Sequence, residues 1–221
     1  MQTVYYKRVR NVSLALTFFA LPFFVMAGSR QGSESIKASV VDSHEGLTVS
    51  AEPWTSVEQY KAKFPKKSPL AAGIVAIQIA FRNSTEESIK IGLDRIRLTI
   101  SIDENNRQEL EPLTPEQLAE IVLRPGAKDP TSRSRIPLPL PTSSGGRNKK
   151  WEELKTAAED ASVRDGVIAP HKSVEGLLYF DLRGQFDLLN SARLYIPNLV
   201  MLESNHQLLY FELDLSHTSQ R

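Results

Sequence analysis

The fold is decided by the segment Val167-Ile-Ala-Pro-His-Lys-Ser-Val-Glu-Gly-Leu-Leu-Tyr-Phe-Asp-Leu182. Pro170 fixes its φ at about −65° and Ser173 can hydrogen-bond nearby backbone, so 170–173 predict a tight turn. The alternation after the turn predicts a strand. One face of this strand carries Val174, Gly176, Leu178 and Phe180, and the other carries Glu175, Leu177, Tyr179 and Asp181.

An earlier segment, Gly73-Ile-Val-Ala-Ile-Gln-Ile-Ala-Phe81, predicts a central strand that shares a core with the first one. Shorter apolar alternations predict further strands at 36–42, 46–52, 88–91, 95–102, 192–196 and 206–215. Two of these have a defined inward face. We expect Ile96, Leu98, Ile100 and Ile102 to face the core in one, and Leu209, Phe211, Leu213 and Leu215 in the other.

Three helices are predicted at 56–64, 114–123 and 151–163. The second has Thr114 at the N-cap, Pro115 at the first helical position and Gln117 three residues after the cap. Between the last two helices, 124–150 lacks periodicity and contains the run Ile136-Pro-Leu-Pro-Leu-Pro141, which favours polyproline II. We therefore expect a mainly β, antiparallel β-sandwich over 36–215, with a helical, Pro-rich insertion at 103–165.

Two pieces of the chain resemble a known family. Ile77-Gln-Ile-Ala-Phe-Arg-Asn-Ser-Thr-Glu-Glu-Ser-Ile-Lys-Ile91 resembles the hairpin of immunoglobulin-like domains in secreted bacterial proteins of the DUF4352 and LEA14-like kind. Residues 168–180 are similar to their element of proline, polar turn, glycine and apolar strand, with His171 where the family often has glycine. The resemblance implies an immunoglobulin-like sandwich and no catalytic residues.

The N-terminal residues have the pattern of a secretory signal. Lys7, Arg8 and Arg10 precede an apolar run that ends in Val25-Met-Ala27. We expect cleavage near Ala27, a short polar leader at 28–35, and a periplasmic or extracellular protein with a tail at 216–221. A retained membrane anchor is the alternative, although the run is short and contains Pro22. No later segment is apolar enough to predict a transmembrane helix.

Composition limits the partners. The chain has 27 basic and 26 acidic residues, and removing the three basic residues of the signal leaves 24 against 26, a net charge of −2. This balance gives no general attraction to nucleic acid. There is no cysteine, so an exported domain would depend on its core rather than on disulfides.

Motifs for common chemistries are missing from the sequence. The histidines at 44, 171, 206 and 217 form no close pair, so we predict no metal site and no cofactor. His44 is expected in an exposed turn. Gly-x-Ser-x-Gly and phosphate-binding loops do not occur. Asn83-Ser-Thr85 matches the glycosylation pattern, which has little weight in a bacterial-looking chain.

We therefore predict an exported non-enzymatic protein that serves as an interaction or structural module of the bacterial envelope. Its partner would be an envelope protein or an anionic surface. The candidate binding residues are the basic side chains of the insertion, namely Arg124, Lys128, Arg133, Arg135, Arg147, Lys149 and Lys150. The alternative hypotheses are idle, solvated charges, or an enzyme or ligand-binding protein whose site forms only in the fold, with His171 and His206 as candidates.

Overall fold

A computed structural model describes residues 39–102, 106–123 and 145–218. The predicted signal and leader (1–35) lie outside this part of the chain. The first layer is an antiparallel sheet in the order β1-β2-β3-β8, formed by β1 (Val40–His44), β2 (Leu47–Trp54), β3 (Ile74–Asn83) and β8 (Ser173–Asp181). The two segments that defined the predicted core pair directly, because Ile74–Arg82 align with Ser173–Asp181.

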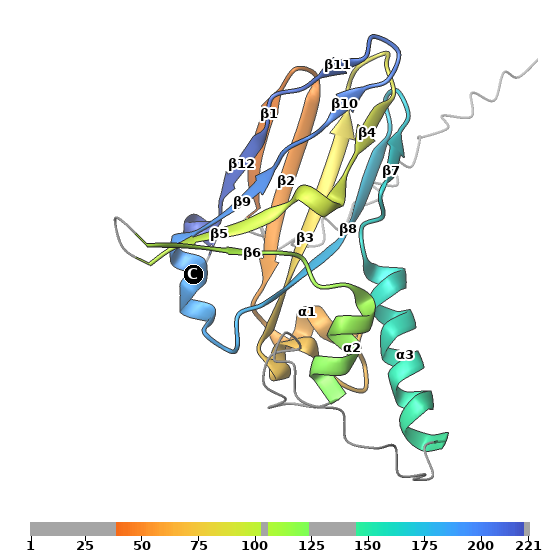
Figure 1. The fold of residues 1–221 in the computed structure, drawn as a ribbon, viewed down its shortest axis with the longest axis vertical. Helices are drawn as coiled ribbons and strands as arrows, with labels where there is room; N and C mark the ends of the chain where they lie inside the picture. The colour runs from red at the N-terminus through yellow and green to blue at the C-terminus, as the bar shows by residue number, and fades with distance from the viewer. Residues whose placement is uncertain (1–38, 103–105, 124–144, 219–221) are drawn as a thin grey trace, which may run out of the picture. The chain divides into compact units, whose positions relative to one another are not determined.

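The second layer contains two antiparallel sheets (Figure 1). The first has the order β12-β9-β5-β6, from β12 (Phe211–Asp214), β9 (Ala192–Ile196), β5 (Arg97–Ser101) and β6 (Arg107–Leu110). The second has the order β11-β10-β4-β7, from β11 (His206–Gln207), β10 (Val200–Met201), β4 (Ile89–Ile91) and β7 (Gly166–Ile168). Short 3-10 turns complete the fold: η1 (Pro69–Ala72), η2 (Leu93–Arg95), η3 (Phe186–Ser191) and η4 (Leu215–Thr218).

The core between the two layers follows the predicted alternation. Val75, Ile77, Ile79 and Phe81 of β3 are fully buried there, with Leu178 and Phe180 of β8. Residues from β5, β9 and β12 cover them from the second layer. The predicted mainly β, antiparallel sandwich is therefore confirmed.

Three helices cover the opposite face of the first sheet. They are α1 (Val57–Lys61), α2 (Pro115–Leu123) and α3 (Gly145–Ala161), which gather at one end of that sheet in Figure 1. Ile74, Ala76, Leu177 and Tyr179 of the sheet pack against them in a second apolar cluster. The described helices of the predicted insertion thus pack on the sandwich, and they bury the second face of the first sheet at that end. None of the described helices is long and apolar enough to span a bilayer.

Local sequence signals set the starts of two helices. The Thr114 amide donates to Gln117 Oε1 at 2.8 Å, and the Gln117 amide donates to Thr114 Oγ1 at 3.3 Å, which is a capping box. The Ser56 amide donates to Gln59 Oε1 at 3.0 Å at the start of α1. The cap at Thr114 agrees with the sequence prediction.

A glycine in β8 allows α3 to join the sheet. A Cβ at Gly176 would lie 2.2 Å from the Val163 nitrogen, so a larger residue would collide with backbone. The Val163 amide donates to the Leu177 carbonyl at 3.2 Å, just after α3 ends. Gly176 therefore fixes where the end of α3 meets the edge of the sheet.

Asn83 is the single buried polar residue among those the structure describes. Its amide nitrogen donates to the carbonyls of Glu87, Ile168 and Ala169, and its oxygen accepts from the amide and the hydroxyl of Thr85. The side chain joins the β3–β4 turn to the end of β7. Because the amide is buried and fully bonded, the glycosylation pattern here serves a structural role.

Several local predictions were wrong. The strand predicted at 206–215 is interrupted between β11 and β12, so Leu208 is buried and Leu209 is 66% exposed. Ile102 is 54% exposed because β5 ends at Ser101. The predicted insertion contains β6, which pairs with β5. The predicted loop 124–150 ends earlier, because α3 begins at Gly145.

Candidate functional site

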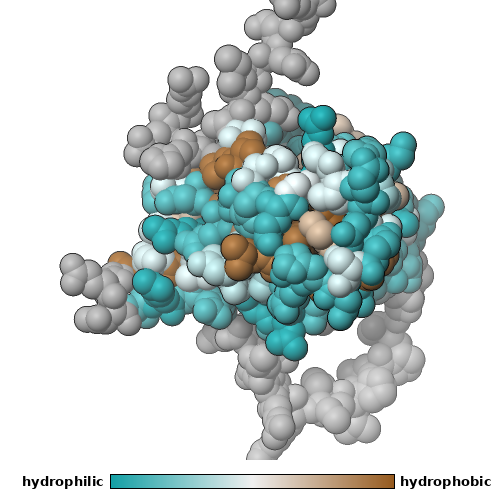
Figure 2. Space-filling view, turned by 90° about the horizontal axis from the view of Figure 1, so that it is seen from above, coloured by the Kyte–Doolittle hydropathy of each residue, from teal (hydrophilic) through white to brown (hydrophobic). Residues whose placement is uncertain are grey.

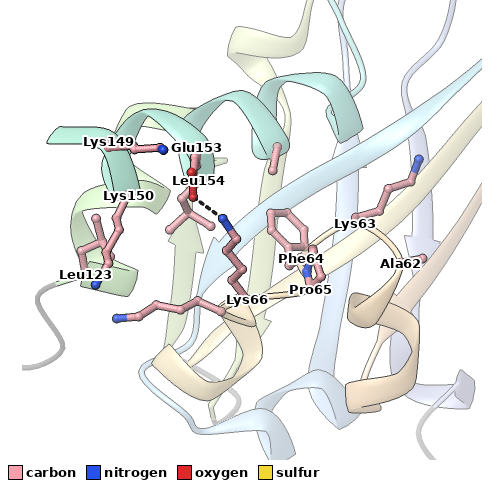
Figure 3. A pocket seen from close by; sticks show the side chains of 12 residues that line it. Ala62, Lys63, Phe64, Pro65, Lys66, Leu123, Lys149, Lys150, Glu153 and Leu154 are labelled. Carbon is pink, nitrogen blue, oxygen red and sulfur yellow. Dashed lines mark hydrogen bonds and ion pairs between the residues drawn. The ribbon is translucent and has the colours of Figure 1, made fainter. Parts of the chain in front are cut away.

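A cleft of about 920 Å³ opens on the helical side of the molecule. One wall is the loop 62–67 after α1, and the other is α3 between Lys149 and Ala157, with Leu123 at the end of α2 (Figure 3). This volume lies within the range of small-molecule sites, roughly 300–1,000 Å³. The cleft is therefore large enough for a ligand.

The cleft is strongly basic. Among the described residues that line it, there is one carboxylate, Glu153, against five lysines, at positions 63, 66, 67, 149 and 150. Lys66 reaches across from the loop to α3, where its Nζ lies 2.7 Å from Glu153 Oε2 (Figure 3). This hydrogen bond, together with the charges of Lys66, Lys149 and Lys150, holds the pKa of Glu153 below its usual value. An anion entering the cleft would meet an excess of positive charge.

The lining between the lysines is apolar. Phe64 and Leu154 form its buried part, while Leu123 and Ala157 are half-buried and Pro65 is exposed. Lysine stems add methylene groups to the walls, because long cationic side chains lay their stems along apolar surface. The cleft thus combines apolar side chains with lysine ammonium groups on both walls.

The loop that carries Lys66 and Lys67 is anchored by aromatic packing. The Phe64 amide donates to the Tyr60 carbonyl at 2.7 Å, and the Phe64 ring contacts Tyr179 edge-on with centroids 6.1 Å apart. The Tyr60 hydroxyl donates to the Trp54 carbonyl at 3.0 Å and accepts from the Ala76 amide at 2.7 Å. Burial raises the pKa of the Tyr60 hydroxyl, so the group stays neutral. These contacts therefore fix the position of the loop that carries Lys66 and Lys67.

An ion pair and apolar contacts hold the opposite wall. Lys155 Nζ lies 3.1 Å from Glu116 Oε1 and joins α3 to α2, and this hydrogen bond raises the pKa of Lys155. The same Nζ lies 5.7 Å from the centre of the Trp151 ring. Below them, Leu118 and Ala158 are fully buried between the helices and the sheet. Lys155 thus helps to hold α2 and α3 together.

The structure brings together only some of the predicted binding residues. Lys149 and Lys150 are exposed and line the cleft, and Arg147 lies in the first turn of α3. The other four predicted residues, Arg124, Lys128, Arg133 and Arg135, lie outside the described part of the chain.

Three cleft lysines were missed by the sequence analysis. Lys63, Lys66 and Lys67 belong to the loop after α1, and the pair Lys66-Lys67 between two prolines reads as a solvated turn. The separation of Lys66 and Glu153 is 87 residues, so no local pattern reports their meeting. The one available signal was that both segments contain adjacent lysines.

The histidines proposed for an enzyme belong to different elements, because His171 lies in the turn before β8 and His206 begins β11. His171 Nε2 is 3.0 Å from Glu86 Oε1, and His206 Nε2 is 3.2 Å from Glu45 Oε1; both histidines are exposed. His171 has φ of 55°, in the left-handed region where glycine is favoured. Within residues 39–102, 106–123 and 145–218, no three His, Asp or Glu side chains could hold a metal ion.

His44 differs from its prediction as an exposed turn residue. It ends β1, and its half-buried ring stacks on Phe211 with centroids 3.7 Å apart. The next residue, Glu45, accepts a hydrogen bond from the Leu209 amide at 2.7 Å. The β1–β2 turn is therefore attached to the segment before β12.

Other surfaces offer less. A smaller cleft of about 290 Å³ lies where β6 and the end of β8 approach, lined by both acidic and basic residues including Glu111, Asp181 and Arg183. The end of the molecule seen in Figure 2 is mainly hydrophilic, with hydrophobic residues in small groups. The lysine-rich cleft is therefore the stronger candidate.

Comparison with protein-family models and with curated proteins gives no match. Among solved structures, a functionally unknown protein from Listeria monocytogenes EGD-e is similar, with 14% sequence identity and a TM-score of 0.32. The match covers 82% of this chain and 74% of that one. The likeness is too distant to carry an argument about function, and the resemblance to DUF4352 and LEA14-like domains stays a prediction.

Proposed function

We propose that the protein is an exported, non-enzymatic interaction module of the bacterial envelope, which holds an anionic ligand or partner in the lysine-rich cleft. The observation that carries this proposal is the presence of five lysines and one glutamate around a cleft of about 920 Å³. Clefts lined by one sign of charge concentrate the field and attract ions of opposite sign.

The charge excess is local. The whole chain is almost neutral, with 27 basic and 26 acidic residues, so the cleft is not one part of a generally basic surface. The lysines come from two segments far apart in the sequence and converge because α3 packs beside the loop 62–67 (Figure 3). Keeping like charges close together has an electrostatic cost, which an anionic ligand would remove.

The exported part of the proposal rests on the N-terminal sequence. The basic residues before 11, the apolar run and Val25-Met-Ala27 are the pattern of a secretory signal. Mass spectrometry of the protein isolated from its native host tests it. A mature N-terminus at Gly28 is expected, and an intact N-terminus would contradict cleavage.

A charge-matched pair of variants tests the binding site. We would measure binding of three probes by calorimetry: a hexaglutamate peptide, pyrophosphate and dodecanoate. Lys149→Glu with Lys150→Glu should weaken the binding of any probe that occupies the cleft by roughly tenfold or more, because attraction becomes repulsion. The control, Lys90→Glu with Lys172→Glu, changes the net charge equally at exposed positions outside the cleft.

Binding that falls with salt and with the cleft variant, but not with the control, would support the proposal. Equal loss in both variants would mean that net charge alone attracts the anion. If none of the three anions bound, the proposed function would be wrong.

A further inference from the structure

We propose that the occupant of the lysine-rich cleft is a single-chain anionic amphiphile, in which an alkyl chain ends in a carboxylate or similar acidic group. This inference rests on the proposed function and narrows it, because a purely polar anion would also satisfy the charge. Three features of the cleft carry the choice.

The first feature is the apolar interior. Phe64 from the loop and Leu154 from α3 lie on the two walls of the cleft (Figure 3), and Leu123 at the end of α2 and Ala157 of α3 add to its apolar lining. A small polar anion would leave these side chains in contact with water, whereas an alkyl chain would cover them. Burial of each methylene group is favourable and accumulates along the chain.

The second feature is the kind of cation. Among the residues that the structure describes, the basic side chains that line the cleft are all lysines. Arginine recognises phosphate or carboxylate with two parallel hydrogen bonds, whereas the lysine ammonium is a point charge on a flexible stem. The lysines therefore attract an acidic head group without selecting its shape. Selectivity then depends on the alkyl chain of the ligand.

The third feature is size. At about 920 Å³ the cleft matches a small molecule. A folded protein partner usually covers about 800 Å² on each side. The cleft lies between one loop and one face of α3, which suits a single alkyl chain.

Glu153 has a defined part in this arrangement. Its carboxylate pairs with Lys66 at 2.7 Å, so it competes with the ligand's acidic head group for this lysine. The adjacent Glu152 is exposed and does not line the cleft. Glu153→Gln should therefore strengthen binding of the amphiphile by up to about fivefold, while Glu152→Gln, with the same change in charge, should change it less.

The test is a series of straight-chain carboxylates, from butanoate to dodecanoate, each kept below its micelle-forming concentration. Calorimetry on the purified full-length protein should give affinities that rise by up to about fourfold for each added methylene, until the chain fills the cleft. Ala157→Phe, which fills the interior, should abolish this dependence on length. Lys149→Glu with Lys150→Glu should weaken binding at every length.

The outcomes separate the two proposals. Equal affinity for all lengths would overturn the amphiphile and leave anion binding intact. Binding only to phosphatidylglycerol vesicles would also overturn it, since the ligand would then be a membrane surface. If affinity still rose with alkyl length in Ala157→Phe, the alkyl chain would bind outside the cleft and the proposal would be wrong. If neither these carboxylates nor hexaglutamate nor pyrophosphate bound, both proposals would fail.

Discussion

The first sheet separates two cores of different composition. On one face, the sandwich core contains only Ala, Val, Leu, Ile and Phe among its fully buried members. On the other face, the helical core contains Trp54, Tyr60 and Tyr179, whose polar atoms are hydrogen-bonded. The first core can only hold the layers together. The second also sets the position of the loop and of α3, and the lysine-rich cleft lies beside it.

The largest expected effect comes from emptying the sandwich core. Phe81→Ala should lower the free energy of unfolding by about 3–5 kcal/mol, because it removes a fully buried ring from β3. Denaturant unfolding measures this change. Val41→Ala is the control, since Val41 is 56% exposed, and its change should stay within about 0.5 kcal/mol. A small effect for Phe81→Ala would contradict the assignment of this core.

The second-largest loss of stability is expected at Asn83, the buried polar residue at the edge of the sandwich core. Asn83→Ala should lower the free energy of unfolding by about 3 kcal/mol, because it leaves the Thr85 amide and buried carbonyls without a partner. Ser84→Ala, at an exposed neighbour, is the control. If Asn83 carried a glycan in the native protein, its buried position would be wrong.

The helical core should respond to the loss of one hydroxyl. Tyr60→Phe should cost about 2 kcal/mol, because the buried Ala76 amide and Trp54 carbonyl lose their shared partner. It should also weaken binding in the cleft, since the loop after α1 rests on Tyr60. Tyr210→Phe, at a 54% exposed residue, should change neither quantity. Unchanged binding in Tyr60→Phe would show that the cleft does not depend on this core.

The smallest expected effect is a pH dependence at the sandwich edge. The Leu209 amide and His206 lower the pKa of Glu45 below its usual value of 4.5. A lowered folded-state pKa stabilises the protein above the usual value, and this contribution is lost as the pH falls through the lowered pKa. Glu45→Gln should therefore reduce stability at pH 6, and its difference from wild type should shrink below about pH 4.5. A constant difference at all pH values would contradict this linkage.

The sandwich could be predicted from sequence because its signals are local. Alternation along β3 and β8 assigned their inward residues correctly, and the cap at Thr114 located the start of α2. The break before β12 was missed because Leu209 fits the alternation. In the structure the Leu209 amide donates to the side chain of Glu45, 164 residues away, a contact that no local pattern reports.

The candidate site was only partly predictable. Lys149 and Lys150 were chosen for their basic character, but the apolar interior between them and Lys66 depends on helix packing. Gly176 shows why this could not be inferred. Its role is the approach of the Val163 backbone, which a period-2 pattern does not report.

The central claim is that the ligand site lies on the helical side of the first sheet. Lysine footprinting by amine acetylation, read by mass spectrometry with and without dodecanoate, tests it most directly. The account predicts protection of Lys66, Lys67, Lys149 and Lys150, with no change at Lys90 and Lys172. Equal protection at all six lysines, or protection only at Lys90 and Lys172, would contradict it.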